Sequence, residues 1–448
     1  MSVSHVSHAV LLTPRPFEDL DRAGRFMLVP LLPERPPPKT LPVEVWEQII
    51  EDLLNDGNVC KLTGWKGTRT CRRDILLVCK TINNIALPIF YSRVHLNSLE
   101  ALEKFTNHLH SSDERWDSLR RIPYSTPGRW VQRLDISSLK PASPREECDI
   151  DALLTQLFPL LPCLKELHFS PHVQTTGRVL DSLADSDARA HLMVLRGMKG
   201  AISPGSALAA CRDPLVRVLR ASRNMRELEV VGPGFDFSDP DLWEAGEPLP
   251  DTTFVPLDLP HLKTLTVLST QSSPLLYALL HSPLPSLTSL TVTPYHDISY
   301  PTSLVSEFIQ THGQNLTSLS LYTPKSWPTI LHTSPSTLLE TSPNLRHLSL
   351  ENPIPFLAFP SAVSGRAHPL KIISVPRPSA QFLSPLESIL PSLPSLVAVR
   401  ARDVHWLRKG ISSRAQEAGV QGLMRDWKRR FSRRGIKILD ADWKECLD

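Results

Sequence analysis

Near the start of the chain, large apolar residues recur as adjacent pairs four positions apart, with polar residues between the pairs. The pairs are Val45 with Trp46, Ile49 with Ile50, and Leu53 with Leu54. This spacing is typical of an apolar stripe on a helix, and Pro42 suits the first turn, where a missing backbone N–H costs nothing. A second apolar stretch from Ile75 to Tyr91 also has helical periodicity, and Pro88 is expected to end or kink it. The pattern predicts two short helices.

Two such short helices are too small to bury this many large side chains between themselves. Each large apolar side chain left in water forgoes about 1.5 to 3 kcal/mol of burial free energy. The two stripes must therefore pack on the rest of the chain, on another protein, or on both.

Further along the chain, a unit of the form Leu-x-x-Leu-x-Leu returns at regular intervals, usually just after a proline or an asparagine. Clear copies begin at Pro162, Pro260, Pro285, Asn315, Pro343 and Pro394, and weaker copies begin at Val131, Met225, Leu370 and Ile436. The first leucines at 262, 287, 316, 345, 370 and 396 are 25 to 29 residues apart. This is the period of leucine-rich repeats. It also accounts for the 42 prolines, about twice the usual share.

The repeats predict an α/β fold of strands alternating with helices. Each unit alternates like a strand, and an apolar helical stretch precedes it, as in 275–280 and 304–309. Because no single unit covers its own apolar face, the units should stack into a solenoid with a curved parallel sheet and helices on its convex side. The long gap between Leu164 and Met225 is expected to contain extra helices around 179–209. We also expect a protruding loop over 232–256. A doubly wound α/β sheet is the alternative, but its strands would be longer and preceded by fewer prolines.

The order of residues in the leading segment resembles a known family. Leu41-Pro42-x-Glu44-x-Trp46 is followed by Leu76-Leu77-Val78-Cys79-Lys80 and then by Ala86-Leu87-Pro88-x-x-Tyr91-x-x-Val94-His95-Leu96. These blocks resemble the F-box of fungal F-box proteins, which irregular leucine-rich repeats follow. The connection from Asn55 to Asp74 is longer than is usual in that family. We interpret it as a surface insertion, which costs little loop-closure entropy; weakened docking is the alternative.

The resemblance implies a function and an organisation. The F-box would bind a Skp-type adaptor, and through it a cullin-RING ubiquitin ligase, while the repeats bind a protein target. The implied adaptor contacts are Leu41, Pro42, Val45, Ile49, Leu53, Leu77, Val78, Cys79 and Ile82. The expected parts are a disordered segment over 1–38, an F-box-like domain over 39–96, a linker helix within 97–128 and the repeat domain over 129–448. Alternatively, the chain is a repeat scaffold without a ligase role, capped by the hairpin.

Composition narrows the class of partner and compartment. The 49 basic and 46 acidic residues nearly cancel, so net charge indicates neither a nucleic acid nor a membrane as partner. The seven cysteines are scattered without a CxxC pair, which argues against disulfides and zinc. No apolar run is long enough for a signal peptide or a membrane span. We expect a protein of the cytoplasm or the nucleus that is not secreted. The basic run 427–435 is interpreted as the solvated face of a closing helix rather than a nuclear-localisation or nucleic-acid patch.

Motifs of catalysis are lacking. The sequence has no phosphate-binding loop, no HExxH and no GxSxG, so we expect no enzyme, cofactor or metal; an enzyme with a dispersed site is the remaining alternative. The candidate target-binding residues lie between the inward leucines of the strands, on the concave face. They are Glu166, His168, Glu227, Glu229, Thr264, Thr266, Ser289, Thr291, Ser318, Ser320, Tyr322, His347, Ser349, Arg400 and Arg402. Their charge passes from acidic through hydroxyl-rich to basic, which is predicted to orient a protein target; alternatively, Ser and Thr simply suit exposed strands.

Overall fold

The computed structural model describes residues 41–55, 74–114, 127–199, 207–232, 254–270, 273–293, 304–322, 337–351, 368–406 and 419–445. The segment predicted to be disordered over 1–38 lies outside these ranges. So do most of the connection from Asn55 to Asp74 and most of the loop predicted over 232–256. Within the described residues, no helix is both long and apolar enough to span a bilayer.

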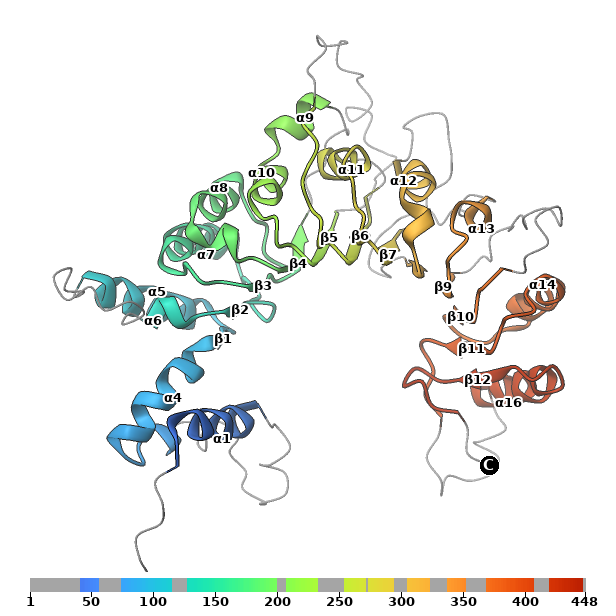
Figure 1. Ribbon diagram of the computed structural model, residues 1–448, viewed down its shortest axis with the longest axis horizontal. Helices are drawn as coiled ribbons and strands as arrows, with labels where there is room; N and C mark the ends of the chain where they lie inside the picture. The colour runs from blue at the N-terminus through green and yellow to red at the C-terminus, as the bar shows by residue number, and fades with distance from the viewer. Residues whose placement is uncertain are drawn as a thin grey trace, which may run out of the picture.

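The described strands form one open sheet in which every strand is parallel to its neighbours and pairs with the strands next to it in sequence. The strands are β1 (Arg93–His95), β2 (Arg133–Asp135), β3 (Glu166–His168), β4 (Val194–Lys199), β5 (Glu227–Val231), β6 (Thr264–Leu268), β7 (Ser289–Val292), β8 (Ser318–Leu321), β9 (His347–Ser349), β10 (Ile372–Val375), β11 (Ala398–Ala401) and β12 (Lys437–Leu439). They line the inner side of an arch (Figure 1). The predicted solenoid with a curved parallel sheet is therefore confirmed.

Helices cover the outer side of the arch (Figure 1). They are α5 (Leu99–Glu114), α7 (Pro144–Leu157), α8 (Gly177–Asp185), α9 (Ala207–Arg212), α10 (Pro214–Ala221), α11 (Pro274–Leu280), α12 (Leu304–His312), α13 (Leu338–Thr341), α14 (Ala380–Ile389) and α16 (Gly419–Ser432). Pro144, Pro214 and Pro274 stand at the first helical positions, each after a residue whose side chain accepts a backbone N–H of the first turn. These positions explain part of the high proline content.

A ladder of aliphatic side chains forms the core. One residue from the middle of each strand from β2 to β12 points between sheet and helices, and the register aligns these residues across the whole sheet. The ladder comprises Leu134, Leu167, Leu195, Leu228, Leu265, Leu290, Leu319, Leu348, Ile373, Val399 and Ile438, all at most 1% exposed. Alternate positions along each strand then face the concave side, as the strand period requires.

The extra helices expected around 179–209 are present as α8 and α9, and the gap between Leu164 and Met225 also contains a strand. A complete further repeat with strand β4 and helix α8 lies there, and Leu192 and Leu195 occupy the positions of the missing leucines. Its strand departs from the pattern because Gly197 adopts a φ of 71° and the pairing with β5 shifts register between Leu195 and Met198. A Cβ at Gly197 would lie 2.4 Å from the carbonyl oxygen of Phe169, so glycine is required at this irregularity.

The leading hairpin consists of α1 (Val43–Asn55) and α4 (Lys80–Ser92), which pack against each other. Helix α4 does not start at Ile75 as expected. Residues 77–79 form a non-helical turn, and the Cys79 sulfur accepts the backbone N–H of Ile82 as an N-cap at 3.5 Å. Pro88 lies inside α4 without ending it.

The hairpin continues directly into the repeats. Strand β1 follows α4 at once and pairs with β2. Ser98 caps the N-terminus of helix α5, because its hydroxyl accepts a hydrogen bond from the N–H of Ala101 at 3.2 Å. The helix buries Leu102 and Leu109 and packs against α7. The sheet therefore begins within the range 39–96, and the helix expected as a linker covers the first repeat. At the other end, α16 buries Met424, Trp427 and Phe431, as its stripe predicted.

Candidate protein-docking surfaces

Helix α1 divides its apolar pairs between two faces. Ile50 is only 2% exposed and lies on the side that packs against α4, where Trp46 and Leu54 are half-buried. The preceding member of each pair faces outward, so that Ile49 is 37% and Leu53 46% exposed. Because residues four apart fall on one line of a helix, each half of the stripe forms a continuous row.

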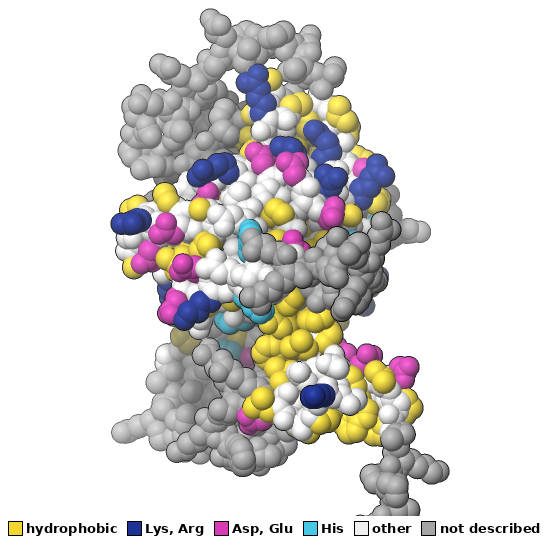
Figure 2. Space-filling view, turned by 90° about the vertical axis from the view of Figure 1, so that its left-hand side faces the viewer, with side chains coloured by type: hydrophobic (Ala, Val, Ile, Leu, Met, Phe, Trp, Pro, Cys, Tyr) yellow, Lys and Arg dark blue, Asp and Glu magenta, His cyan; other side chains and the backbone are white. Residues whose placement is uncertain are grey.

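The turn before α4 is also exposed. Leu77 is 81% and Val78 64% exposed, Leu41, Pro42, Val45 and Cys79 are also exposed, and Ile82 is half-buried. Seven of the eleven large hydrophobic side chains that are exposed in the described residues belong to this hairpin, namely Leu41, Val43, Val45, Ile49, Leu53, Leu77 and Val78. Hydrophobic side chains gather in the lower part of the molecule in Figure 2, where the hairpin lies. Such a concentration is typical of a protein-binding surface. We call it the hairpin patch.

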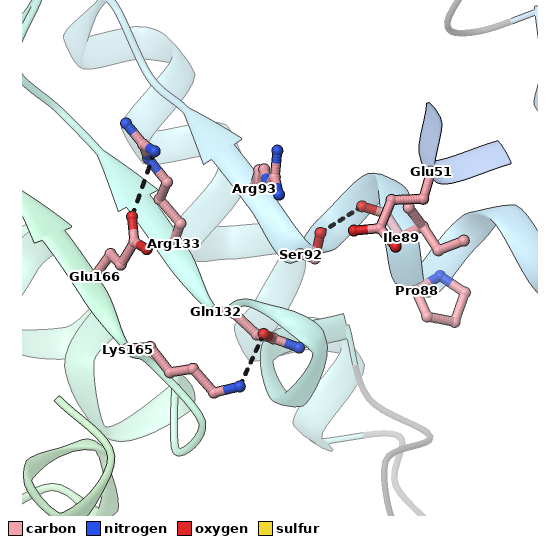
Figure 3. Close-up of a pocket in the computed structure, with 9 residues that line it drawn as sticks. All are labelled: Glu51, Pro88, Ile89, Ser92, Arg93, Gln132, Arg133, Lys165 and Glu166. Carbon is pink, nitrogen blue, oxygen red and sulfur yellow. Dashed lines mark hydrogen bonds and ion pairs between the residues drawn. The ribbon is translucent and has the colours of Figure 1, made fainter. Parts of the chain in front are cut away.

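A cavity of about 400 Å³ lies between the hairpin and the first strands. It is lined by Glu51, Pro88, Ile89, Ser92, Arg93, Gln132, Arg133, Lys165 and Glu166 (Figure 3). Glu166, one of the predicted target-binding residues, forms an ion pair with Arg133 at 3.3 Å. The Lys165 ammonium donates a hydrogen bond to the side-chain oxygen of Gln132 at 3.1 Å. Both contacts are drawn in Figure 3. The cavity is therefore polar and mixed in charge.

The acidic end of the concave face is neutralised by arginines. Arg196 of β4 donates two hydrogen bonds of 2.7 Å to the two carboxylate oxygens of Glu227. The hydrogen bond to Glu227 raises the pKa of Arg196, and burial raises the pKa of Glu229. His168 is buried rather than exposed, and this burial lowers its pKa. The acidic residues are thus in place, but their charge is largely balanced.

The middle of the concave face carries two rows of hydroxyl groups in register. One row is Thr264, Ser289 and Ser318, and the other is Thr266, Thr291 and Ser320. All six residues are half-buried. The Ser318 hydroxyl lies 3.1 Å from Nδ1 of His347, whose Nε2 lies 2.8 Å from the hydroxyl of Ser374. Tyr322, the other predicted residue of these repeats, directly follows β8 and is half-buried.

At the far end, the predicted basic residues lie in a cluster of aromatic and acidic groups. Arg402 donates to the Ser349 hydroxyl at 2.8 Å, pairs with Glu351, and lies 5.2 Å from the ring centroid of Tyr322. Ser349 is buried beneath this contact rather than exposed. The charge of Arg402 is therefore balanced within the protein.

Arg400 occupies the neighbouring position of this cluster. Its guanidinium lies 4.1 Å from the ring centroid of Trp443 and donates to the carbonyl oxygen of Ala441 at 2.6 Å. Burial lowers the pKa of Arg400, and burial together with Arg400 and Arg402 lowers the pKa of His347. Most charged residues of the predicted gradient from acidic to basic thus already contact other groups of the protein. Glu227 and Arg402 form ion pairs, and Arg400 contacts Trp443 and a backbone carbonyl.

One set of contacts has the order of a serine-hydrolase relay. Nδ1 of His95 lies 3.4 Å from the Asp135 carboxylate, and Nε2 lies 3.3 Å from the Ser138 hydroxyl. Burial raises the pKa of Asp135, but hydrogen bonds from Ser137 outweigh it, so this pKa lies below its usual value. The cavity described above is lined by other residues. We assign these contacts to holding the turn after β2 against β1.

A second cluster brings together groups that can ligate metals. Ligand atoms of His405, Asp440 and Asp442 lie within 4.8 Å of one another. Asp440 is buried, however, and its carboxylate accepts the backbone N–H groups of Asp442, Lys444 and Trp406 at 2.9, 2.8 and 3.1 Å. Because both oxygens already shape the turn after β12, this carboxylate has a structural role.

An open parallel sheet of repeats, a buried ladder of leucines and helices on the outer face define a solenoid of the leucine-rich-repeat type. No family model matches the chain, and neither does any curated protein. Among solved structures, it is similar to TLR13 in a TLR13–ssRNA13 complex, with 16% identity and a TM-score of 0.32 over 71% of this chain and 37% of that one. The chain thus spans little more than a third of TLR13.

Two further similarities have comparable strength. The internalin InlF of Listeria monocytogenes shows 14% identity and a TM-score of 0.31, covering 79% of this chain and 84% of that one. Rad7 in the yeast Rad7–Elc1 complex shows 14% identity and a TM-score of 0.27, covering 74% of this chain and 88% of that one. The assignment of the fold rests on the strand order and the buried ladder of this protein itself.

Proposed function

We propose that this protein is the substrate-recognition subunit of a Skp-cullin-F-box ubiquitin ligase, in which the hairpin binds the Skp-type adaptor and the repeats bind a protein target. The observation that carries the proposal is the outward hairpin patch. The residues that the F-box resemblance assigns to the adaptor, except the half-buried Ile82, are exposed together on one small element. Apolar side chains in such a patch gain burial only when another protein covers them.

The connection between hairpin and repeats suits this function. Helix α4 passes without a loop into β1, which pairs with β2 along its whole length from Arg93 to His95. A target held on the repeats would therefore keep a fixed position relative to the adaptor. The ligase works in this proposal by proximity, because a tethered target presents its lysines at a high effective concentration.

Binding of the full-length chain to a purified Skp-type adaptor tests the proposal. We expect a stoichiometric complex in size-exclusion chromatography. Leu77→Ser with Val78→Ser should remove roughly 2 to 4 kcal/mol of burial, which raises Kd by about thirtyfold or more. The matched control is Val397→Ser with Leu423→Ser, which changes two apolar residues that are 50% and 37% exposed outside the hairpin. The control should bind normally.

Two results would contradict the proposal. One is a wild-type chain that forms no complex with the adaptor, and the other is an equal loss of binding in the hairpin variant and in its control. In the first case the chain would instead be a repeat scaffold whose hairpin caps the solenoid, without a ligase role.

A further inference from the structure

The residue immediately before each strand forms a separate row along one rim of the sheet. Backbone hydrogen bonds connect the row from strand to strand, for example from the N–H of Lys263 to the carbonyl of Arg226 and from the N–H of Lys371 to that of Arg346, both at 2.8 Å. Five of these rim residues are basic: Lys165, Arg226, Lys263, Arg346 and Lys371. We call this set the basic rim. It precedes β3, β5, β6, β9 and β10.

The basic rim differs from the concave face in how its charges are compensated. Within the described residues, none of its five cations forms an ion pair with a carboxylate, and all except Lys165 are exposed. On the concave face, by contrast, Arg196 of β4 and Arg402, which follows β11, are both paired with glutamates.

Placing like charges side by side is unfavourable in an isolated protein. Arg226 and Lys263 precede neighbouring strands, and so do Arg346 and Lys371, at a strand spacing of about 4.8 Å. Like charges directly opposite each other on adjacent strands destabilise a sheet. The other members of the row from β3 to β10 are Met193, Thr288 and Thr317, so no acidic residue relieves the repulsion within it. A bound anionic group would relieve it.

The end of the basic rim near β3 borders two cavities beside the hairpin. Lys165 lines the cavity shown in Figure 3, which is mixed in charge because Glu51 and Glu166 line it as well as Arg93 and Arg133. It lines a second cavity of about 400 Å³ together with Pro88, Arg129, Trp130, Gln132, Cys163 and His191, a set without any acidic residue. An anionic chain following the rim would thus find, in this second cavity, a recess without acidic residues at the end near β3.

We propose that the basic rim binds an extended acidic segment of a protein partner. From β3 to β10 the row spans seven strand intervals, or about 34 Å, which an extended polypeptide of roughly ten residues would cover. Carboxylates or phosphorylated side chains along it would complement the cations. A single-stranded nucleic acid is a poorer fit because the row from β3 to β10 offers no aromatic side chain on which bases stack. The proposal does not depend on the hairpin or on any adaptor.

Fluorescence anisotropy with the full-length chain tests the proposal. The probe is a labelled peptide of about twelve alternating glutamate and serine residues, used at low and at physiological salt. The rim variant carries Arg226→Glu, Lys263→Glu, Arg346→Glu and Lys371→Glu. The matched control carries Lys140→Glu, Arg145→Glu, Arg212→Glu and Arg377→Glu, which reverses four exposed cations elsewhere with the same change of net charge. Thermal melting of both variants verifies that they fold.

We expect the rim variant to bind the peptide at least fourfold, and on the order of tenfold, more weakly, because each exposed charge contact is worth about 1.4-fold to fivefold in affinity. The control should change affinity less than twofold. Phosphorylating the serines distinguishes the two sources of negative charge, and tighter binding then identifies phosphate as the preferred group. Equal weakening in both variants, no binding by the wild type, or tighter binding of a single-stranded RNA of similar length would each overturn the proposal. A rim variant that fails to fold is replaced by the same four positions changed to Gln.

Discussion

Two neighbouring isoleucines of α1 offer a matched pair of substitutions that separates folding from binding. Ile49 is 37% exposed in the hairpin patch, whereas Ile50 is 2% exposed on the side that packs against α4. The two changes to alanine remove the same atoms from the same turn of the same helix. Their different consequences therefore report only the direction in which each side chain points.

The expected magnitudes follow from these exposures. Ile50→Ala leaves a cavity between the two helices and should cost roughly 2 to 5 kcal/mol of hairpin stability. Ile49→Ala should change stability by less than about 0.5 kcal/mol, because the side chain is already partly in water. If an adaptor covers the patch completely, Ile49→Ala forfeits about 0.6 to 1.1 kcal/mol of binding, or roughly threefold to sixfold in Kd. Adding Leu53→Ala, whose side chain is 46% exposed, brings the loss to roughly tenfold or more.

Two measurements check the pair. Amide hydrogen exchange of the hairpin reports its local stability, and titration of the adaptor reports Kd. We expect protection to fall in Ile50→Ala and to stay unchanged in the variant with Ile49→Ala and Leu53→Ala, whose affinity alone should drop. The reasoning fails if the double variant loses protection as much as Ile50→Ala does, or if it binds the adaptor as tightly as the wild type.

Three further predictions concern the repeats. Leu290→Ala in the buried ladder should lower the free energy of unfolding by roughly 2 to 5 kcal/mol, and Thr291→Ala beside it by less than about 1 kcal/mol, as measured by denaturant titration. Arg196→Met should cost about 1 kcal/mol, and a double-mutant cycle with Glu227→Gln should recover that coupling. Burial lowers the pKa of His312, so the unfolded state binds more protons and stability is lost as the pH falls below about 6.5. The melting temperature should therefore drop on acidification, less steeply in His312→Gln.

The sequence predicted the solenoid because the Leu-x-x-Leu-x-Leu pattern and its period reflect the strands and the buried ladder directly. It missed the repeat of β4 because Gly197 and the register shift displace Met198 from the position that a third leucine would take. The helices of the hairpin were visible in the paired apolar residues. The pattern did not show which member of each pair faces outward, because both members recur with the same helical period.

The pairing of charges on the concave face lay beyond the sequence for a different reason. Arg196 belongs to the unrecognised repeat, and Glu351 follows β9 in a part of the unit that the strand pattern does not cover. Ion pairs across neighbouring strands depend on register, which appears only when the repeats are stacked. The sequence of a single repeat therefore shows its charged residues but not their partners in other repeats.

Register also determines where the protein can discriminate by charge. The residues of the basic rim each follow the first leucine or methionine of a unit, so they are as visible in the sequence as those of the concave face. Stacking treats the two rows differently. On the concave face, Arg196 and Arg402 meet carboxylates from other repeats, whereas the rim cations have other cations or neutral residues as their neighbours in the row. A partner gains little by displacing an ion pair that is already made, and more by supplying one that is missing. Selection by charge should therefore lie at the rim, and selection by shape and hydrogen bonding on the hydroxyl rows of the concave face.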